Sequence, residues 1–211
     1  MNNKVYAVLT GDIVKSRDLS SDQTRKLQQR LKSAAMDFQT VFADTVVGKL
    51  GITRGDGWQV ALQKPEYALR FALFIRAIVK AEFQTDTCVS MGIGPAELVK
   101  DKIIESTGLA FERSGLGLES LKNKNIRMAY YSHKITGRLE SAESLLVSWL
   151  DLLITPGTEK QASLLKEVLI KLKQDDVAKK MGLVQSTVSE GLKAVGWHEM
   201  KRILNHFEKY R

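Results

Sequence analysis

Two aspartates, Asp12 and Asp56, are placed where a sheet could bring their carboxylates together. Asp12 closely follows an apolar run over residues 5–9, which has the length and composition of a buried strand. Asp56 lies in the stretch Arg-Gly-Asp-Gly, which indicates the tip of a β-hairpin. If the first strand lies beside that hairpin, both carboxylates reach one edge of the sheet, where two hard oxygen ligands suit Mg²⁺. Either aspartate alone could instead be an ordinary turn residue.

The residues after Asp12 have the character of a phosphate-binding loop. Mg²⁺ commonly takes its remaining ligands from water and from the phosphates of a nucleotide. Backbone N–H groups and cationic side chains in this loop would hold such phosphates. We therefore predict Mg²⁺ together with a purine nucleotide, contacted by Ile13, Val14, Lys15, Ser16 and Arg17. Arg17 could equally belong to a surface salt bridge, and Lys15 could be solvated.

The segment from residue 175 to residue 189 has the pattern of a helix-turn-helix. Val177 and Met181 are spaced to share the buried face of a first helix, and Ala178 is small where a second helix must cross it. Gly182 can end the first helix in the left-handed conformation. Leu183 is expected to plug the turn, and Ser186 is expected to cap the second helix. The buried stripe of that helix would consist of Val188, Leu192 and Val195. The alternative is a small helical bundle whose turn fits the pattern by chance.

The start of that second helix carries short hydrogen-bonding side chains. A recognition helix presents such side chains to the major groove of DNA, and helix N-termini favour phosphate. Residues 155–211 hold eleven Lys and Arg against seven Asp and Glu, which is half of the chain's net charge of +8. We predict DNA contacts by Gln185, Ser186, Thr187, Ser189, Glu190 and Lys193.

Composition places the chain among globular proteins and limits its chemistry. Of its 211 residues, 44% are apolar and 27% are charged, which is outside the range of disordered chains. One cysteine, Cys88, excludes an internal disulfide framework, and three histidines without a cysteine cluster offer no zinc site. No stretch approaches a membrane helix or a signal peptide, so we expect a cytoplasmic protein.

The elements that must position these residues alternate between strands and helices up to residue 131. Strands are expected over residues 5–9, on both sides of the Asp56 turn, over 89–93 and over 126–131. Helices are expected after a capping box at Ser20 and Gln23, after Pro65 and over 109–121. This β, α, β-hairpin, α, β, α, β order predicts an α/β sandwich of ferredoxin-like type, with the helices on one face of the sheet.

After residue 131 every remaining segment has a helical period. Residues 133–154 are expected to form one or two helices, and a turn at residues 155–158 precedes the last ones. We therefore predict a domain over residues 1–132, linking helices over 133–154 and a helix-turn-helix domain over 155–211. An apolar stripe near the C-terminus is expected to pack on that domain or to form a dimer seam, and it consists of Trp197, Met200, Leu204 and Phe207.

Three motifs carry a family resemblance. Residues 10–14, Thr-Gly-Asp-Ile-Val, resemble the first metal-binding strand of class III nucleotidyl cyclases. Residues 54–58, Arg-Gly-Asp-Gly-Trp, are similar to the second such strand and to the hairpin of diguanylate cyclases, and Met-Gly-Ile-Gly at 91–94 is similar to a later cyclase strand. Together with the helix-turn-helix, nearly the whole chain resembles the SatD family of bacterial proteins. The resemblance implies a cyclase-like palm domain with Asp12 and Asp56 as its metal ligands.

The chain departs from the cyclase pattern where the transition state would be stabilised. Class III cyclases carry an Asn and, four residues on, an Arg on a late helix. The corresponding residues here are Glu112 and Leu116 or, in another register, Lys134 and Arg138. Gly57 also replaces the Glu of the diguanylate cyclase hairpin. A metal pair without these partners indicates nucleotide binding more readily than cyclisation.

Three functions are compatible with this pattern. The first is a DNA-binding transcriptional regulator that acts as a homodimer and senses a nucleotide with Mg²⁺ through the palm domain. The second is an active nucleotidyl cyclase or nucleotidyl transferase that its helix-turn-helix directs to DNA. The third is a vestigial palm domain that serves only to assemble dimers.

Overall fold

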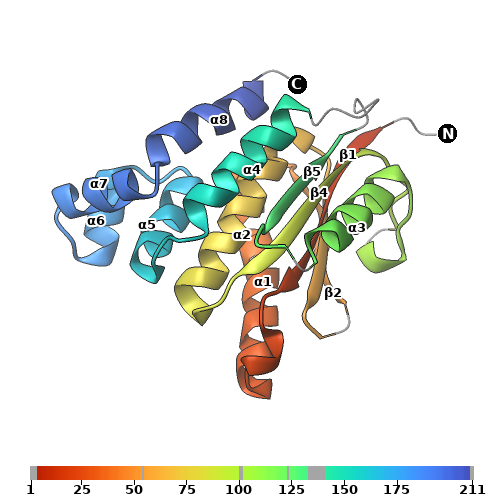
Figure 1. The fold of residues 1–211 in the computed structure, drawn as a ribbon, viewed down its shortest axis with the longest axis horizontal. Coiled ribbons are helices and arrows are strands. Elements are labelled where there is room, and N and C mark those ends of the chain that lie inside the picture. The colour runs from red at the N-terminus through yellow and green to blue at the C-terminus, as the bar shows by residue number, and fades with distance from the viewer. Residues whose placement is uncertain (1–3, 54, 100–101, 123, 133–140, 210–211) are drawn as a thin grey trace.

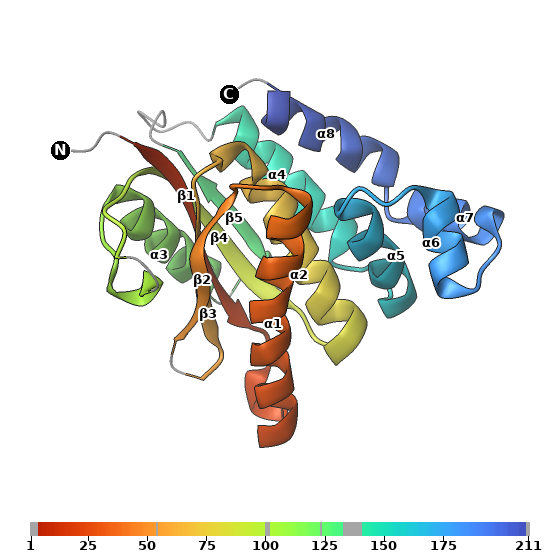
Figure 2. The ribbon, with the colours of Figure 1, turned by 180° about the vertical axis from the view of Figure 1, so that it is seen from behind.

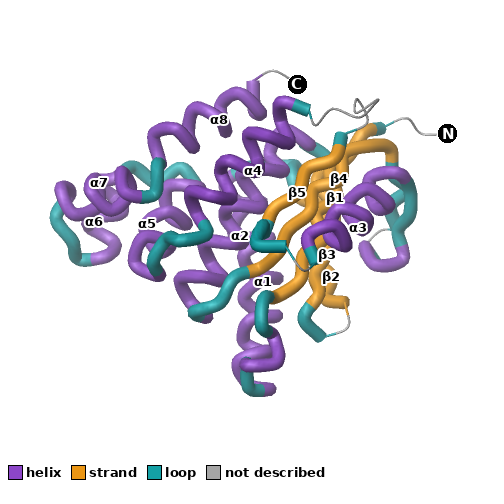
Figure 3. The backbone as a smooth tube through the Cα atoms, viewed as in Figure 1, coloured by secondary structure: helices purple, strands orange, loops and turns teal. Residues whose placement is uncertain are grey.

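The computed structural model describes residues 4–53, 55–99, 102–122, 124–132 and 141–209. A five-stranded sheet lies at the centre of one half, and the helices of residues 159–194 lie at the other end (Figure 1). The tube view separates the strands from the helices that surround them (Figure 3). The strands are β1 (Val5–Ile13), β2 (Val46–Thr53), β3 (Gly57–Leu62), β4 (Thr87–Pro95) and β5 (Met128–Tyr131). The α-helices are α1 (Ser21–Val41), α2 (Ala68–Phe83), α3 (Leu109–Leu121), α4 (Ala142–Ile154), α5 (Glu159–Leu169), α6 (Gln174–Met181), α7 (Gln185–Ala194) and α8 (Trp197–Lys209).

The strand order of the sheet is β2-β3-β1-β4-β5, and every neighbouring pair is antiparallel except β4 and β5. The first four strands with α1 and α2 form the β-α-β-β-α-β unit of the ferredoxin-like fold, so the predicted fold class is confirmed. Strand β1 is longer than predicted, because residues 10–13 continue to pair with their neighbours. Asp12 is therefore the penultimate residue of β1, opposite Gly57 on one side and Cys88 on the other.

Helices α1 and α2 cover one face of the sheet. Helix α1 begins at the predicted capping box, in which the Gln23 N–H donates to Ser20 Oγ (3.2 Å) and the Ser20 N–H donates to the Gln23 side chain (2.8 Å). Phe38 of α1 is fully buried, and its ring lies 5.0 Å from that of Phe71 on α2. Trp58 of β3 belongs to the same core, and its indole N–H donates to Thr87 Oγ1 (3.0 Å). Trp58 is thus a core residue.

Helix α3 covers the opposite face, which contradicts the expectation that all helices pack on one face. Figure 2 shows α1 and α2 on one side of the sheet and α3 on the other. Side chains of β1 alternate between the faces: Leu9 belongs to the core under α1 and α2, whereas Val8 packs with Ala110 of α3. Gly92 allows the close approach of α3, because a Cβ there would overlap the α3 backbone.

The C-terminal helices share a continuous core with the sheet domain. Helix α5 packs along α2, and buried residues of α5, α6, α7 and α8 belong to the same hydrophobic cluster as those of α1 and α2. The stripe on α8 turns back to the sheet domain, where the Phe207 ring meets Tyr130 of β5 edge to face at 5.5 Å. Of the predicted linking helices, α4 is observed, and residues 133–140 lie outside the described residues. The division at residues 132 and 155 remains a prediction.

Two buried arginines of α2 hold these layers together. Arg76, 3% exposed, pairs with Asp86 before β4 and with Asp151 of α4, both at 2.6 Å. Arg70 pairs with Glu208 of α8 (2.5 Å) and donates to the Leu169 carbonyl at the end of α5 (3.0 Å). Burying a guanidinium is costly unless carboxylates and carbonyls receive its N–H groups, so each arginine depends on partners contributed by the C-terminal helices.

None of the helices in the described ranges combines the length and the apolar character that a bilayer crossing requires.

Candidate functional site

The structure brings Asp12 and Asp56 to the same end of the sheet. Asp12 pairs with Gly57 across β1 and β3, and Asp56 directly precedes Gly57 in the turn of the hairpin. Both side chains are half-buried. The predicted adjacency of the first strand and the hairpin is therefore observed.

The electrostatics of Asp12 reflect the proximity of the second carboxylate. Burial raises the pKa of Asp12, and the negative charge of Asp56 raises that pKa further. A hydrogen bond from the Ile13 N–H and the positive charge of Lys122 act in the opposite direction and do not cancel the increase. A divalent cation bound beside Asp12 would favour its charged form, which burial and the charge of Asp56 disfavour.

The backbone around Asp12 is shaped by the indole of Trp58. Gly11 faces that indole, and a Cβ on residue 11 would overlap the ring. Because Trp58 is fully buried and its N–H is bonded to Thr87, the ring has no room to yield. Glycine at position 11 therefore allows β1 to stay paired with β3 as far as Asp12.

The loop after Asp12 is only partly available to phosphate. Ile13 is buried, and the Val14 N–H already donates to the Asp86 carbonyl at 2.9 Å. Ser16 donates its hydroxyl to Asp56 Oδ2 at 2.5 Å, whereas the Arg17 side chain is exposed. Of the five loop residues predicted to contact phosphate, only Lys15 and Arg17 have exposed side chains, and the Ser16 hydroxyl proton is already given to Asp56.

An open hollow of about 240 Å³ adjoins these groups. Ser16, Arg17 and Asp56 line it together with apolar side chains of the loop and of α1. Within the described ranges no cluster of three or more His, Cys, Asp or Glu could enclose a metal ion. Two carboxylates and a hydroxyl fit Mg²⁺, which keeps several waters and takes oxygen ligands from a bound phosphate, better than they fit zinc.

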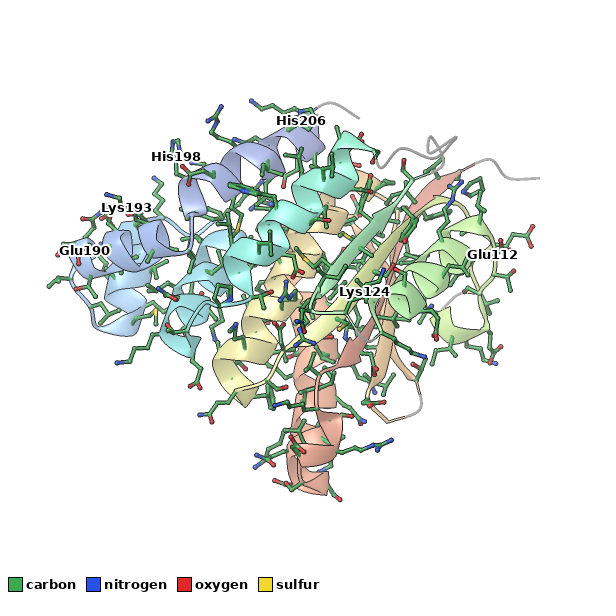
Figure 4. All side chains as sticks on the ribbon, in the orientation of Figure 1. Glu112, Lys124, Glu190, Lys193, His198 and His206 are labelled. Carbon is green, nitrogen blue, oxygen red and sulfur yellow. The ribbon has the colours of Figure 1, made fainter. Side chains whose placement is uncertain are left out.

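The late helix contributes a cation, but not at the positions that the cyclase pattern suggested. Glu112 and Leu116 of α3 are both exposed, and Figure 4 shows Glu112 pointing away from the sheet. Lys122, at the end of α3, is instead the residue whose charge reaches Asp12. No spacing signal in the sequence relates Lys122 to Asp12, because only the packing of α3 on the sheet brings them together. Lys134 and Arg138 lie outside the described residues.

The helix-turn-helix geometry is present in α6 and α7. Gly182 ends α6 in the left-handed conformation (φ 64°), and Leu183 N–H donates to the Ala178 carbonyl at 2.9 Å. The buried residues are Val177 and Ala178 of α6 and, as predicted, Val188, Leu192 and Val195. The sequence therefore located this turn and the residues on which the two helices pack.

Three details of the predicted turn are wrong. Met181 and Leu183 are 36% and 38% exposed, so Met181 is not on the buried face of α6 and Leu183 is not a buried plug of the turn. Ser186 does not cap α7, because the helix starts at Gln185 with Val184 at its N-cap. Val184 has no side-chain group that could bond the first N–H groups of α7.

The predicted DNA-contacting side chains occupy one end of the molecule. Gln185, Ser186, Thr187, Glu190 and Lys193 are exposed, and Ser189 is half-buried. Glu190 and Lys193 point outward at the end farthest from the sheet (Figure 4). Gln185 also donates to Gln174 of α6 at 3.2 Å.

The family model of the SatD family matches residues 6–205. No curated protein sequence is significantly similar to the chain. Among solved structures, the chain is similar to a bacterial light-regulated adenylyl cyclase, with 16% identity and a TM-score of 0.41 over 60% of this chain and 42% of that one. It is also similar to the active GGEEF domain of a diguanylate cyclase from Vibrio cholerae, with 16% identity and a TM-score of 0.41 over 63% of this chain and 85% of that one. The chain thus spans less than half of the adenylyl cyclase.

Proposed function

We propose that this protein, which belongs to the SatD family, is a DNA-binding transcriptional regulator whose sheet domain binds a purine nucleotide with Mg²⁺. The observation that supports DNA binding best is the polar, exposed start of α7 behind a Gly182-terminated helix. The observation that supports nucleotide binding is the pair of interacting carboxylates, Asp12 and Asp56, beside the Ser16 hydroxyl.

The absence of a cap on α7 favours contact with a phosphate. The first N–H groups of a helix have no partner within the helix, and Ser, Thr, Asp or Asn usually supplies one. Val184 supplies none. These N–H groups lie on the same exposed turn as Ser186 and Thr187, so the backbone phosphate of DNA would complete the helix start.

DNA binding can be tested with two substitutions on α7. Thr187→Ala should weaken binding to a target fragment roughly tenfold, because one base or phosphate contact is worth about 1–3 kcal/mol. Lys193→Ala should reduce the slope of the logarithm of affinity against the logarithm of salt concentration by about one, because one phosphate contact is lost. Lys124→Ala is the matched control, since Lys124 is exposed near the sheet, far from α7 (Figure 4). Fluorescence anisotropy on fragments recovered by genome-wide pulldown provides the measurement, and loss of binding in all three variants alike would reject this interface.

Nucleotide binding can be tested by thermal melting. ATP or GTP with Mg²⁺ should raise the melting temperature of the wild type, because a ligand that binds the folded state stabilises it. Asp12→Ala should abolish the increase, whereas Asp176→Ala, on an exposed acidic residue of α6, should preserve it. An equal increase in the Asp12 variant would refute the site. Incubation with Mn²⁺ or Mg²⁺ and a search for a cyclic product then separates a sensor from a nucleotidyl cyclase.

A homodimer is part of this proposal, and helix α4 offers a surface for it. Its exposed residues are all apolar and follow a 3-4-3 spacing: Ala142, Leu145, Trp149 and Leu152. That is the spacing of a helix-pairing seam, and a two-fold arrangement lets the same stripe pack against itself. A second copy also supplies the second recognition helix that a palindromic operator requires.

The seam can be tested by light scattering after size-exclusion chromatography. Trp149→Glu should convert dimer to monomer, because a charge would be buried in the apolar contact. Leu116→Glu is the control, since Leu116 is 71% exposed on α3, outside the stripe. A wild type that is monomeric at tens of micromolar would contradict the homodimer.

A further inference from the structure

A second cleft opens on the other flank of the loop that follows Asp12. It has a volume of about 740 Å³. Its walls come from the residues after β1, the last turn of α2 with its connection to β4, the residue before β5, and the turn between α4 and α5 with the start of α5. The lining includes Val14 and Lys15 of the loop but neither Asp12 nor Asp56. The cleft is therefore distinct from the candidate metal site.

Four cations line this cleft: Lys15, Lys80, Arg127 and Lys160. Only two carboxylates accompany them, Asp86 and Glu159, and Asp86 already receives two hydrogen bonds from Arg76, at 2.6 and 3.0 Å. None of Lys15, Arg127 and Lys160 forms an ion pair with a carboxylate in the part of the chain that the structure describes.

Arg127 is the cation of this cleft with the clearest unsatisfied hydrogen-bond donor. Its Nε is buried and has no hydrogen-bond partner within the described ranges. The guanidinium otherwise lies 3.9 Å from the Cys88 sulfur, which is a weak acceptor. A buried N–H group without an acceptor costs free energy. An anion in the cleft would accept a hydrogen bond from the Arg127 Nε–H and so remove that cost.

Lys80 adds to the excess of positive charge. The pKa of Lys80 is lower than its ordinary value, chiefly because the side chain is partly buried. The nearby charges of Arg76 and Arg127 lower the pKa as well, and Asp86 acts in the opposite direction. The Lys80 ammonium donates to the carbonyls of Ile154 and Thr155 at the end of α4, so it is fixed in place at the cleft wall. The cations thus converge on the turn that leads from α4 into the C-terminal helices.

We propose that this cleft binds an oligophosphate anion, such as the triphosphate of a nucleotide or inorganic triphosphate, without the help of a divalent metal. Lysine and arginine from several elements are the groups that bind phosphate oxygens with charge-assisted hydrogen bonds. The volume is within the range of small-ligand sites. A bound anion joins the sheet domain, through Lys15 and Arg127, to the start of α5, through Lys160.

The test uses the full-length protein in EDTA, which removes any contribution of the Asp12 and Asp56 site. Isothermal titration with inorganic triphosphate should show saturable binding. Arg127→Gln and Lys160→Gln should each weaken binding roughly tenfold. Lys160 is exposed, and the hydrogen bond of Arg127 to Asp151 uses its backbone N–H (2.7 Å), so both variants should keep the wild-type melting temperature without ligand. Asp12→Ala should leave the affinity unchanged.

Two controls decide the result. Lys124→Gln removes an exposed lysine that does not line the cleft, and sodium sulfate at matched ionic strength reports general screening. Equal loss of affinity in Lys124→Gln, or binding of sulfate in the same titration as tight as that of triphosphate, would refute the cleft. ATP in EDTA identifies the source: tighter binding than inorganic triphosphate assigns a nucleotide, and equal binding assigns the phosphates alone. Loss of the Mg²⁺-dependent nucleotide effect in Asp12→Ala, with triphosphate binding intact, separates the two sites.

Discussion

Replacing Asp151 with alanine tests how firmly the C-terminal helices are joined to the sheet domain. Asp151 is 1% exposed and accepts three hydrogen bonds, from Arg76 Nη1 (2.6 Å), the Arg127 N–H (2.7 Å) and Thr155 Oγ1 (3.1 Å). Its loss leaves Arg76 buried with Asp86 as its remaining carboxylate. Breaking a buried pair from one side costs about 3–5 kcal/mol. For a chain of this size that corresponds to a fall of roughly 10 °C in melting temperature.

Calorimetry and urea unfolding measure this loss. Asp151→Asn should destabilise less than Asp151→Ala, because the amide oxygen still accepts a hydrogen bond and the cavity is not created. Asp22→Ala removes an exposed carboxylate that pairs with Arg25 and Lys26, and it should leave the melting temperature almost unchanged. If Asp151→Ala shifts the melting temperature no more than Asp22→Ala does, the buried network does not stabilise the junction.

The same experiment addresses the domain division. One cooperative transition in the wild type would indicate that the C-terminal helices unfold with the sheet domain, as a shared core requires. Two transitions, with only the lower one shifted by Asp151→Ala, would support separate domains at the predicted boundary.

Two further predictions concern stability. Burial raises the pKa of Glu82, but hydrogen bonds and charges from Lys166 and Arg30 hold that pKa below its ordinary value of 4.5. Glu82 therefore contributes stability that is fully present above pH 4.5 and is lost as pH falls through the lowered pKa, so Glu82→Gln should flatten the acid limb of a stability curve measured from pH 6 to pH 3; an unchanged limb would contradict this assignment. Gly11→Ala should cost about 1–3 kcal/mol in urea unfolding, because the added methyl overlaps the buried indole of Trp58, whereas a neutral effect would show that Trp58 can move.

Local signals in the sequence predicted local structure well. The capping box at Ser20 and Gln23 is formed, and Gly182 ends its helix in the left-handed conformation. These features depend on residues within four positions of one another, so the sequence contains all their determinants. The predicted burial of Met181 and Leu183 is wrong, because exposure depends on how much surface the neighbouring helices cover.

The predicted site at Asp12 and Asp56 depends on the adjacency of two strands. A hairpin paired with the first strand places Asp12 opposite the residue after Asp56, and this pairing follows from the order of elements. The order does not show that the Val14 N–H is already bonded, or that the charge of Lys122 reaches Asp12. Both facts arise from contacts between residues distant in sequence.

The sequence by itself determined the alternation of elements, the ferredoxin-like class, the position of the helix-turn-helix and the two aspartates. Periods of two and 3.6 residues, caps and turn residues suffice for these, because each reflects interactions along a short stretch of chain. Only the tertiary structure decided that α3 covers the second face, that α8 packs back on β5 and that four cations converge on one cleft. Burial and charge proximity in those places depend on which surfaces meet in space, and sequence spacing carries no information about that.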